Sequence, residues 1–154
     1  MTVRPATAAD LATVLTLLRE LAAFEGGAVA ASLDDLRAGF AERRFEALLA
    51  EHRGEIVGVL TILPSFSSWR GRPGAVIHDL YVRERVRGQG VGQKLVAALL
   101  AMAPARGWAR IDVAVLDWNR AAQRFYARFG LVPAEGWQIW RLEGEALEKP
   151  DAVQ

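Results

Sequence analysis

A strand, a glycine-rich turn and a helix follow one another in the middle of the chain, and this succession constrains the fold more than any other part of the sequence. Branched and aromatic residues at 75–82 predict a strand, residues 83–92 form a turn with three glycines, and residues 93–103 have the apolar spacing of a helix. A second strand is predicted at 111–116. Two strands joined by a helix in this way lie parallel, with a right-handed crossover between them. The segment therefore predicts a parallel strand pair within one sheet.

The rest of the chain completes a mixed sheet flanked by helices. The other predicted elements are a helix from residue 11 to the Gly26–Gly27 pair, a short helix after Ser32, hairpin strands at 44–51 and 55–63, a loop at 64–74, a helix at 120–129 and a last strand at 137–142. We therefore expect the α/β class (an α+β mixed sheet) with about four flanking helices.

Length and composition narrow the kinds of function. A chain of 154 residues is about one domain, so we expect one domain over residues 1–147 and a frayed tail at 148–154. The 19 basic and 18 acidic residues leave a net charge of +1, which predicts no attraction to nucleic acid or to a membrane surface. With no cysteine and two histidines, the sequence also predicts no metal site. The first residues lack the apolar run of a signal peptide, and no long apolar stretch follows, so a cytoplasmic protein is expected.

The glycine-rich turn is a candidate anion site. It follows a strand and opens a helix, where the first backbone N–H groups have no helical partner and the helix dipole is positive. Gly88, Gly90 and Gly92 would let a phosphate approach the backbone closely. Their spacing fits neither the G-x-G-x-x-G dinucleotide fingerprint nor the P-loop. Two alternatives stay open at this point: a flexible surface turn with a basic rim, and a nucleotide-binding module of another type.

Two motifs resemble the GCN5-related N-acetyltransferase (GNAT) family. Residues 87–92 match its pyrophosphate loop, [QR]-x-x-G-x-[GA], and residues 119–130 match the pattern N-x-x-A-x-x-F-Y-x-x-x-G. The resemblance implies the GNAT fold, whose central sheet splays between its fourth and fifth strands, and acetyl-CoA in the wedge between the strands that end at Val82 and Leu116. The implied cofactor contacts are Leu80, Tyr81, Val82, Arg87, Gly88, Gln89, Gly90, Val91, Gly92, Gln93 and Asn119.

Further stretches resemble the diamine (spermidine/spermine-type) branch of this family. They lie at residues 17–25, 69–71, 115–119 and 135–137, together with Asp79 in the central strand. The resemblance implies that the protein is a homodimer and that the acceptor amine is bound by Glu25, Trp69, Asp79 and Trp137. In that branch a glutamate precedes the central aspartate and helps to deprotonate the amine, whereas this sequence has His78 there.

Direct attack by an amine needs a base for the amine and a donor for the departing thiolate. A primary amine has a pKa near 10.4, so only about one molecule in a thousand is the free base at neutral pH. His78, an imidazole that titrates near neutral pH, is the candidate base, and the alternative is a histidine buried in the strand. The resemblance makes Tyr126 the candidate donor to the thiolate and the backbone N–H groups of residues 80–82 the candidate oxyanion site. The alternative for Tyr126 is an aromatic core residue beside Phe125, and Phe125 is expected to be the more buried of the two.

The expected function is an N-acetyltransferase that uses acetyl-CoA, without a metal, and acetylates a primary amine of a small molecule. A diamine, a polyamine and an amino acid are the candidate acceptors. Two alternatives stay open. One is transfer to an amine of a protein, a peptide or an aminoglycoside, and the other is a non-catalytic sensor of acyl-CoA on the same fold.

Overall fold

The computed structural model describes residues 1–148, and the chain falls into two compact units. The first unit is Met1–Ala114, and the second begins at Val115. The whole sheet and the glycine-rich turn belong to the first unit, and the motif at residues 119–130 belongs to the second. One domain over residues 1–147 stays a prediction.

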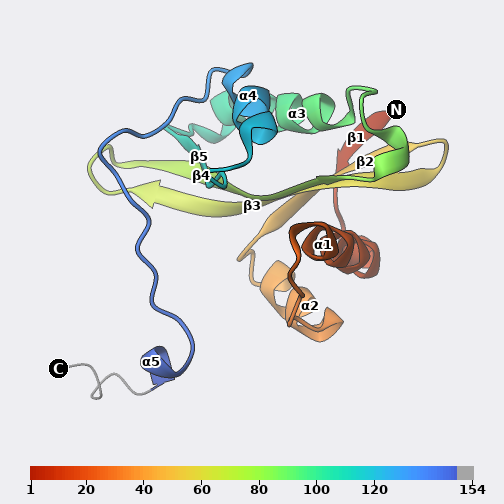
Figure 1. The fold of residues 1–154 in the computed structure, drawn as a ribbon, viewed down its shortest axis with the longest axis horizontal. Coiled ribbons are helices and arrows are strands. Elements are labelled where there is room, and N and C mark those ends of the chain that lie inside the picture. Colours follow the sequence, from red (N-terminus) through yellow and green to blue (C-terminus); the bar gives the residue numbers. More distant parts are fainter. Residues whose placement is uncertain (149–154) are drawn as a thin grey trace. The chain divides into compact units, whose positions relative to one another are not determined.

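The first unit is built on a mixed five-stranded sheet, as the sequence predicts. The strands, in their order across the sheet, are β1 (Thr2–Pro5), β2 (Glu46–His52), β3 (Glu55–Ser67), β4 (Arg72–Val82) and β5 (Ile111–Val113). Neighbouring strands are antiparallel except β4 and β5, which are parallel and connected through α3 (Val91–Arg106). Helices α1 (Leu11–Glu25) and α2 (Leu33–Ala41) lie on one face of the sheet, and α3 lies on the other (Figure 1). The α/β class and the parallel strand pair are therefore confirmed.

Short polar contacts and one glycine fix the ends of α1 and α2. The backbone N–H of Thr7 donates to Asp10 at 2.7 Å, and that of Ser32 donates to Asp35 at 2.8 Å. Both pairs form capping boxes, which satisfy N–H groups that a helix start leaves without partners. The first caps the 3₁₀ turn Ala8–Asp10, which leads directly into α1, and the second caps α2. Gly26 ends α1 in the left-handed conformation, at φ 77°. The end of α1 matters below because it lies beside the candidate site.

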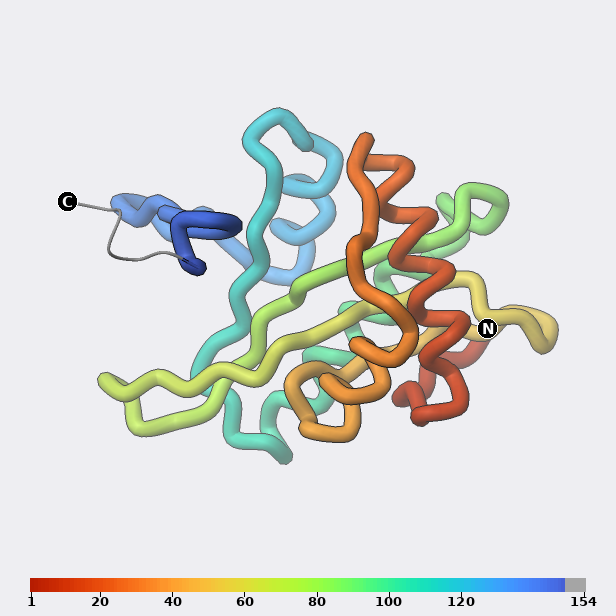
Figure 2. Tube along the Cα trace, turned by 90° about the horizontal axis from the view of Figure 1, so that it is seen from below, coloured from red at the N-terminus to blue at the C-terminus, as the bar shows by residue number. Residues whose placement is uncertain are grey.

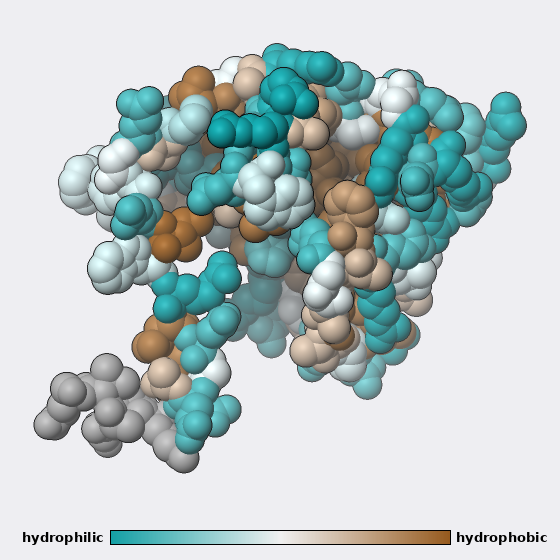
Figure 3. All heavy atoms as spheres, in the orientation of Figure 1, coloured by the Kyte–Doolittle hydropathy of each residue, from teal (hydrophilic) through white to brown (hydrophobic). Residues whose placement is uncertain are grey.

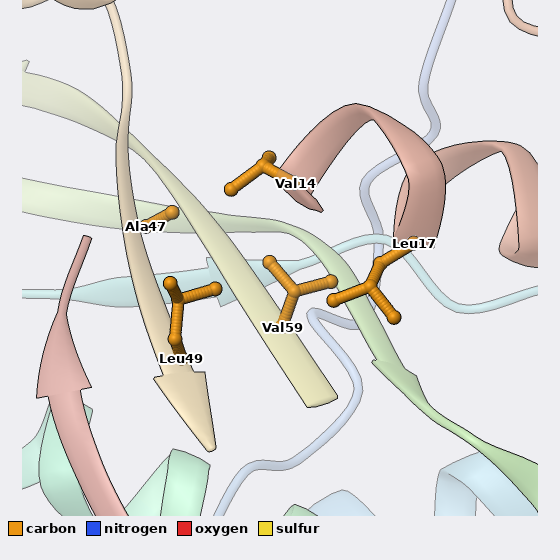
Figure 4. Close-up of a cluster of buried hydrophobic side chains, with 5 residues drawn as sticks. All are labelled: Val14, Leu17, Ala47, Leu49 and Val59. Carbon is orange, nitrogen blue, oxygen red and sulfur yellow. The ribbon is translucent and has the colours of Figure 1, made fainter. Parts of the chain in front are cut away.

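Alternating apolar residues of the strands pack against α1. Val14 and Leu17 of the helix contact Ala47, Leu49 and Val59 of β2 and β3, and all are at most 3% exposed (Figure 4). Burying a valine or leucine side chain fully contributes about 1.5–3 kcal/mol to stability. This cluster fixes α1 on the sheet.

On the other face, α3 approaches β3 closely because Gly58 has no side chain. A Cβ atom at Gly58 would lie 3.2 Å from Leu95 and from the carbonyl oxygen of Tyr81, and 3.3 Å from Val91. Leu95 and Val91 are both buried. Because Val91 is the first residue of α3, this contact fixes the helix start, and with it the glycine-rich turn, against the middle of the sheet.

The hairpin of β3 and β4 is longer than the sequence predicts. The loop expected at 64–74 shrinks to the turn between Ser67 and Arg72. The two strands run side by side over this length (Figure 2). Two prolines suggest a loop in the sequence, yet Pro64 pairs with Ala75 and Pro73 with Phe66. Pairing across the hairpin decides the strand ends here, and local sequence carries no signal for it.

Three further boundaries differ from expectation. β1 is not predicted, since four residues that end in a proline carry no strand pattern; it forms by pairing with β2. α3 continues to Arg106 although Pro104 is expected to end it; the proline lies in the last turn and costs only its own hydrogen bond. β5 ends at Val113 rather than at residue 116 because its pairing with β4 ends there.

The second unit contains α4 (Arg120–Ala127) and the short helix α5 (Glu145–Glu148). The strand expected at 137–142 is wrong, because no strand within residues 1–148 pairs with that segment. Alternating apolar residues suggest a strand, but its backbone groups need a partner. Trp137 and Trp140 are instead 82% and 88% exposed. The expected tail lies outside the described residues, apart from Glu148, which ends α5.

Hydrophilic residues cover most of the face seen in the space-filling view (Figure 3). Of the helices in residues 1–148, none combines the length and the hydropathy that a membrane span requires. The same part of the chain has no group of three or more side chains suited to hold a metal ion.

Candidate active site

The glycine-rich turn between β4 and α3 has the geometry of an anion site. Gly88 and Gly90 are both left-handed, with φ values of 76° and 78°, a conformation that costs glycine little. Gly90 is the N-cap of α3, and its carbonyl oxygen accepts the N–H of Lys94 at 3.0 Å. No side chain in the described part of the chain caps this helix end. The N–H groups of residues 91–93 therefore have no partner within the helix, as an anion such as phosphate requires.

Ion pairs connect the start of this turn to α1 and β3. Arg83 contacts Glu20 of α1 at 2.9 Å and Glu55 of β3 at 2.7 Å, and Arg85 also pairs with Glu55. The hydrogen bond from Arg85 lowers the pKa of the Glu55 carboxyl, and the hydrogen bond to Glu20 raises the pKa of Arg83. These arginines are thus engaged with carboxylates. Their positions hold the base of the turn between a helix and a strand.

The side chain of Arg87 connects the turn to the end of α1. Its Nε donates to the carbonyl oxygen of Val82 at 2.9 Å. Its guanidinium lies 4.9 Å from the ring centre of Phe24 and 5.7 Å from that of Tyr81. Phe24 is followed by Glu25, the last residue of α1. Three expected cofactor residues, Tyr81, Val82 and Arg87, therefore meet beside the helix end that carries Glu25.

Beyond its pairing with β5, the strand β4 has an edge with free backbone groups. The β4–β5 pairing ends at Ile77, and β4 runs on to Val82 without a further paired residue on that side in the described chain. The N–H groups of Asp79 and Arg83 point toward β3, where they bond Thr61 and Val57 at 3.1 and 2.9 Å. Successive residues of a strand alternate, so the N–H groups of Leu80 and Val82 point toward the unpaired edge. This is the parting of the sheet that the resemblance implies.

A β-bulge places His78 where the sheet parts. Thr61 of β3 pairs with Asp79, and the next residue, Ile62, pairs with Ile77, so His78 is the additional residue. The bulge brings two neighbouring side chains together: His78 Nδ1 lies 3.0 Å from Asp79 Oδ2. The His78 side chain is 61% exposed. The alternative of a histidine buried in the strand is therefore wrong.

The pKa values of His78 and Asp79 are those of a base hydrogen-bonded to a carboxylate. The hydrogen bond to Asp79 raises the pKa of His78 above its ordinary 6.5, against a smaller lowering by burial. Burial raises the pKa of the Asp79 carboxyl, but the hydrogen bonds from His78 and Thr61 outweigh it, so that this pKa is lowered. Asp79 is thus a carboxylate at neutral pH, and His78 is an imidazole of increased basicity.

Two expected site residues lie in the second unit. Asn119 is the N-cap of α4, and its Oδ1 accepts the N–H of Ala122 at 3.0 Å, so its amide nitrogen is not needed for the cap. Tyr126 is buried, with its ring centre 5.2 Å from that of Phe125, and burial raises the pKa of its hydroxyl to about 12. The expectation that Phe125 is the more buried is wrong, because Phe125 is only partly buried.

The remaining expected residues are not brought together. Trp69 lies in the turn between β3 and β4 and is 96% exposed, and Trp137 is exposed in the second unit. A cavity of about 590 Å³ does occur in the first unit, between α2, β2 and the end of α3. None of the expected site residues lines it, so the site described here is the edge of β4 and the turn rather than this cavity.

The fold and the two motifs agree with comparisons to known proteins. The sequence profile of the acetyltransferase (GNAT) family matches residues 15–131, which is most of the chain. The chain belongs to the GNAT family. The same fold occurs in the crystal structure of a probable acetyltransferase, with a TM-score of 0.80 at 24% identity over 94% of this chain and 99% of that one.

Two GNAT relatives indicate the branch. The chain is 38% identical over 162 residues to the thialysine N-epsilon-acetyltransferase of Bos taurus, covering 96% of this chain and 95% of the relative. It is 30% identical over 159 residues to the spermidine/spermine N(1)-acetyltransferase-like protein 1 of Homo sapiens, covering 94% of this chain and 23% of that protein. This GNAT protein is therefore an N-acetyltransferase, and these relatives place its sequence nearest the diamine-type branch of the family.

The sequence did not point to two residues beside the site of this GNAT protein. Thr61 is the polar residue buried in the first unit's core, at 3% exposure, and it bonds Asp79. Its signal is visible in retrospect: it is the one hydroxyl in the apolar run 56–63. Glu20, which binds Arg83, has no such signal, because a glutamate on a helix is common on any surface.

Proposed function

We propose that the protein transfers the acetyl group of acetyl-CoA to a primary amine of a small molecule by direct attack. Two neighbouring features support this proposal most directly. The N–H groups of residues 91–93 have no partner within α3, and the unpaired edge of β4 begins at the His78–Asp79 pair. The turn is suited to the pyrophosphate of the coenzyme, because two left-handed glycines keep side chains away from it. Acetyl-CoA supplies the activated acyl group, as a thioester whose C–S bond breaks while the amide C–N bond forms.

The residues of β4 supply the base and the oxyanion site of this proposal. His78 takes the proton of the attacking amine on its free ring nitrogen, at the point where the sheet parts. The N–H groups of Leu80 and Val82 face the same edge and hold the carbonyl oxygen while it gains negative charge. Such donors are already in place before the reaction, so they need no rearrangement when charge develops.

Tyr126 assists the departing thiolate by donating a hydrogen bond. Its hydroxyl has a pKa of about 12, whereas a thiol has a pKa near 8.5. Full proton transfer to the thiolate would therefore be uphill by about 5 kcal/mol, so the hydrogen bond itself is the stabilising contribution.

Tyr126→Phe should lower kcat by about 100-fold and change the dissociation constant of acetyl-CoA by less than about threefold, because the hydroxyl acts on charge that develops in the reaction. Thiol release at saturating amine measures kcat, and a fluorescence titration measures coenzyme binding. Phe125→Leu is the matched control in the neighbouring position. Equal turnover of Tyr126→Phe and wild type would remove Tyr126 from the mechanism.

We infer that the acceptor amine belongs to a diamine, a polyamine or an amino acid with an amine on its side chain. The names of the two relatives, which refer to thialysine and to spermidine and spermine, support this class. Glu25, Trp69 and Trp137 are the proposed acceptor contacts; the fourth expected contact, Asp79, is engaged with Thr61 and His78. Free thiol release with a panel of amines tests the proposal: thialysine, ornithine, spermidine, a peptide N-terminus and an aminoglycoside.

The panel also separates the alternatives. Acetylation of the peptide or the aminoglycoside alone would favour a different acceptor class. Tight binding of acetyl-CoA without thiol release from any amine would favour a non-catalytic sensor. Homodimerisation and a cytoplasmic location stay predictions. The exposed apolar side chains of Trp137, Ile139 and Trp140 support a contact with another molecule.

Gly90→Ala should raise the dissociation constant of acetyl-CoA about tenfold, since an alanine at φ 78° strains the N-cap whose neighbouring N–H groups hold the pyrophosphate. The thermal shift measures this, because a ligand at 100 times its dissociation constant adds about 2.7 kcal/mol to stability. Gly71→Ala is the control: it also places an alanine at a left-handed position, at φ 61°, but in the β3–β4 turn. If both variants keep the full coenzyme-induced shift in Tm, the glycine-rich turn does not bind the coenzyme.

A further inference from the structure

We propose that Asp79 and Thr61 are positioning residues for the reaction: Thr61 fixes the Asp79 carboxylate, and Asp79 fixes the His78 ring so that Nε2 faces the acceptor amine. This inference rests on the proposed function and deepens it. It assigns a role to Thr61, a buried residue of β3 that belongs to no motif, and it gives Asp79 a role other than binding the acceptor.

The first step is the contact between Thr61 and Asp79. The Thr61 hydroxyl oxygen accepts the backbone N–H of Asp79 at 3.1 Å, and the hydroxyl donates to Asp79 Oδ2. Because the oxygen already accepts from the backbone, its proton is directed to the carboxylate. Thr61 is 3% exposed and lies in a well-packed strand, so the carboxylate is held by a rigid group.

The second step is the orientation of His78. The same Oδ2 atom of Asp79 lies 3.0 Å from His78 Nδ1. A carboxylate only accepts hydrogen bonds, so Nδ1 carries the proton and Nε2 carries the lone pair. An adjacent residue in a regular strand would point to the opposite face, and only the bulge lets Asp79 reach the ring.

The third step is the fate of the proton. When the amine attacks, its proton passes to Nε2 and the ring becomes an imidazolium with protons on both nitrogens. Asp79 stays ionised and stabilises that charge, as a carboxylate beside a histidine base does. The proton later leaves Nε2 for solvent, because the ring is exposed.

Among the residues of β3, β4 and β5 near His78, Asp79 is the charged one that contacts its ring. On its own strand the neighbour is Asp79, and from β3 the facing residue is the uncharged Thr61. From β5 the nearest paired charge is Asp112, opposite Val76, which is directed to Arg110 at 3.6 Å. The shifts in pKa agree, since Asp79 is the cause of the raised pKa of His78.

The alternative is that Asp79 only receives the cationic acceptor. Oδ2 already accepts from Thr61 and lies against His78, and the side chain is 22% exposed. A carboxylate engaged in this way is better placed to act through the ring than to bind a mobile ammonium group. The two roles separate experimentally, because one changes kcat and its pH dependence and the other changes KM.

The test compares Asp79→Asn, Thr61→Val and Thr61→Ser with the control Asp112→Asn, which removes a carboxylate one strand away. We measure kcat and KM by thiol release from pH 5.5 to 9 with the best amine of the panel. We also titrate the His78 ring by NMR, with the His78→Gln variant to distinguish its signal from that of His52. Circular dichroism and melting temperature check that each variant is folded.

We expect Asp79→Asn and Thr61→Val to lower kcat by about 10- to 100-fold, with KM changed less than about threefold. The NMR midpoint of His78 and the lower midpoint of the kcat profile should both move to lower pH, because the carboxylate that stabilises the protonated ring is removed or loosened. Thr61→Ser keeps the hydroxyl and should stay within about threefold of wild type.

Three results would overturn the inference. A raised KM with unchanged kcat and unchanged midpoints would make Asp79 a receptor for the acceptor cation. A Thr61→Ser variant as slow as Thr61→Val would make Thr61 a packing residue. A wild-type protein that releases no thiol with any amine would overturn the proposed function itself, and the catalytic role with it.

Discussion

His78→Gln is expected to lower kcat by about 10²–10⁴-fold, the usual contribution of a positioned general base. Glutamine has a similar size and can still donate to Asp79, but its amide cannot take a proton at neutral pH. The acceptor amine must then lose its proton to water, and only the small free-base fraction reacts. The loss should be largest near neutral pH and should shrink as the pH approaches 10, where the amine is deprotonated in solution.

The pH profile of the wild type checks the same assignment. The hydrogen bond to Asp79 raises the pKa of His78 above 6.5. A base acts when it is unprotonated, so kcat should rise with pH and its midpoint should lie above 6.5, while His78→Gln should lose this midpoint. His52→Gln is the control, since His52 ends β2 and is the other histidine of the chain. Similar rates for His78→Gln and His52→Gln across this pH range would show that the proton leaves by another route.

Gly74→Ala is expected to destabilise the protein by about 3 kcal/mol, through overpacking between β4 and β5. A Cβ atom at Gly74 would lie 2.6 Å from the carbonyl oxygen of Arg110 and 2.9 Å from Ser65 Oγ. The Arg110 oxygen accepts the N–H of Ala75 at 3.1 Å, a contact next to the start of β5. Backbone on the next strand cannot yield as a flexible side chain can, so the alanine pushes β5 away from β4.

Thermal unfolding measures this loss, and a decrease in Tm of about 10 °C is expected for a chain of this size. Gly27→Ala is the matched control: its Cβ would meet only the carbonyl oxygen of Ala22, at 3.8 Å, and the change should stay within about 0.5 kcal/mol. Because β5 pairs with β4 over only three residues, the Gly74 variant should also lose coenzyme binding. A Gly74→Ala protein as stable as Gly27→Ala would show that the strands separate without cost at this point.

The sequence predicts those elements whose signals are local. Ser32 with Asp35 marks the start of α2, and Gly26 marks the end of α1, because a cap and a left-handed residue are properties of a few neighbouring positions. The strand expected at 137–142 has the right residue types and fails, since a strand also needs a pairing partner. β1 is the reverse case, a segment without a strand pattern that β2 converts into a strand.

The residues of the candidate site also fall into two groups, those with a local sequence signal and those that depend on strand pairing. The glycine-rich turn can be found from the sequence, because Gly88 and Gly90 are glycines for a backbone reason that acts at each position alone. Thr61 cannot be found in this way. Its contact with Asp79 joins residues 18 positions apart, and it exists only because the two strands pair with a bulge between them.

Because of the bulge, the number of residues in β4 determines which way its site residues point. Ile77 and Asp79 pair with consecutive residues of β3, so they face opposite sides of the sheet although they are two positions apart. Every side chain and N–H group from residue 79 to residue 82 is turned over relative to an unbroken strand. Deleting one residue here would send the Tyr81 ring away from the α1 core and turn the open N–H groups toward β3. In this strand, an insertion or deletion of one residue therefore disrupts the site as an active-site substitution would. The turn at 68–71 can gain or lose residues without changing the direction of the side chains and N–H groups of residues 79–82.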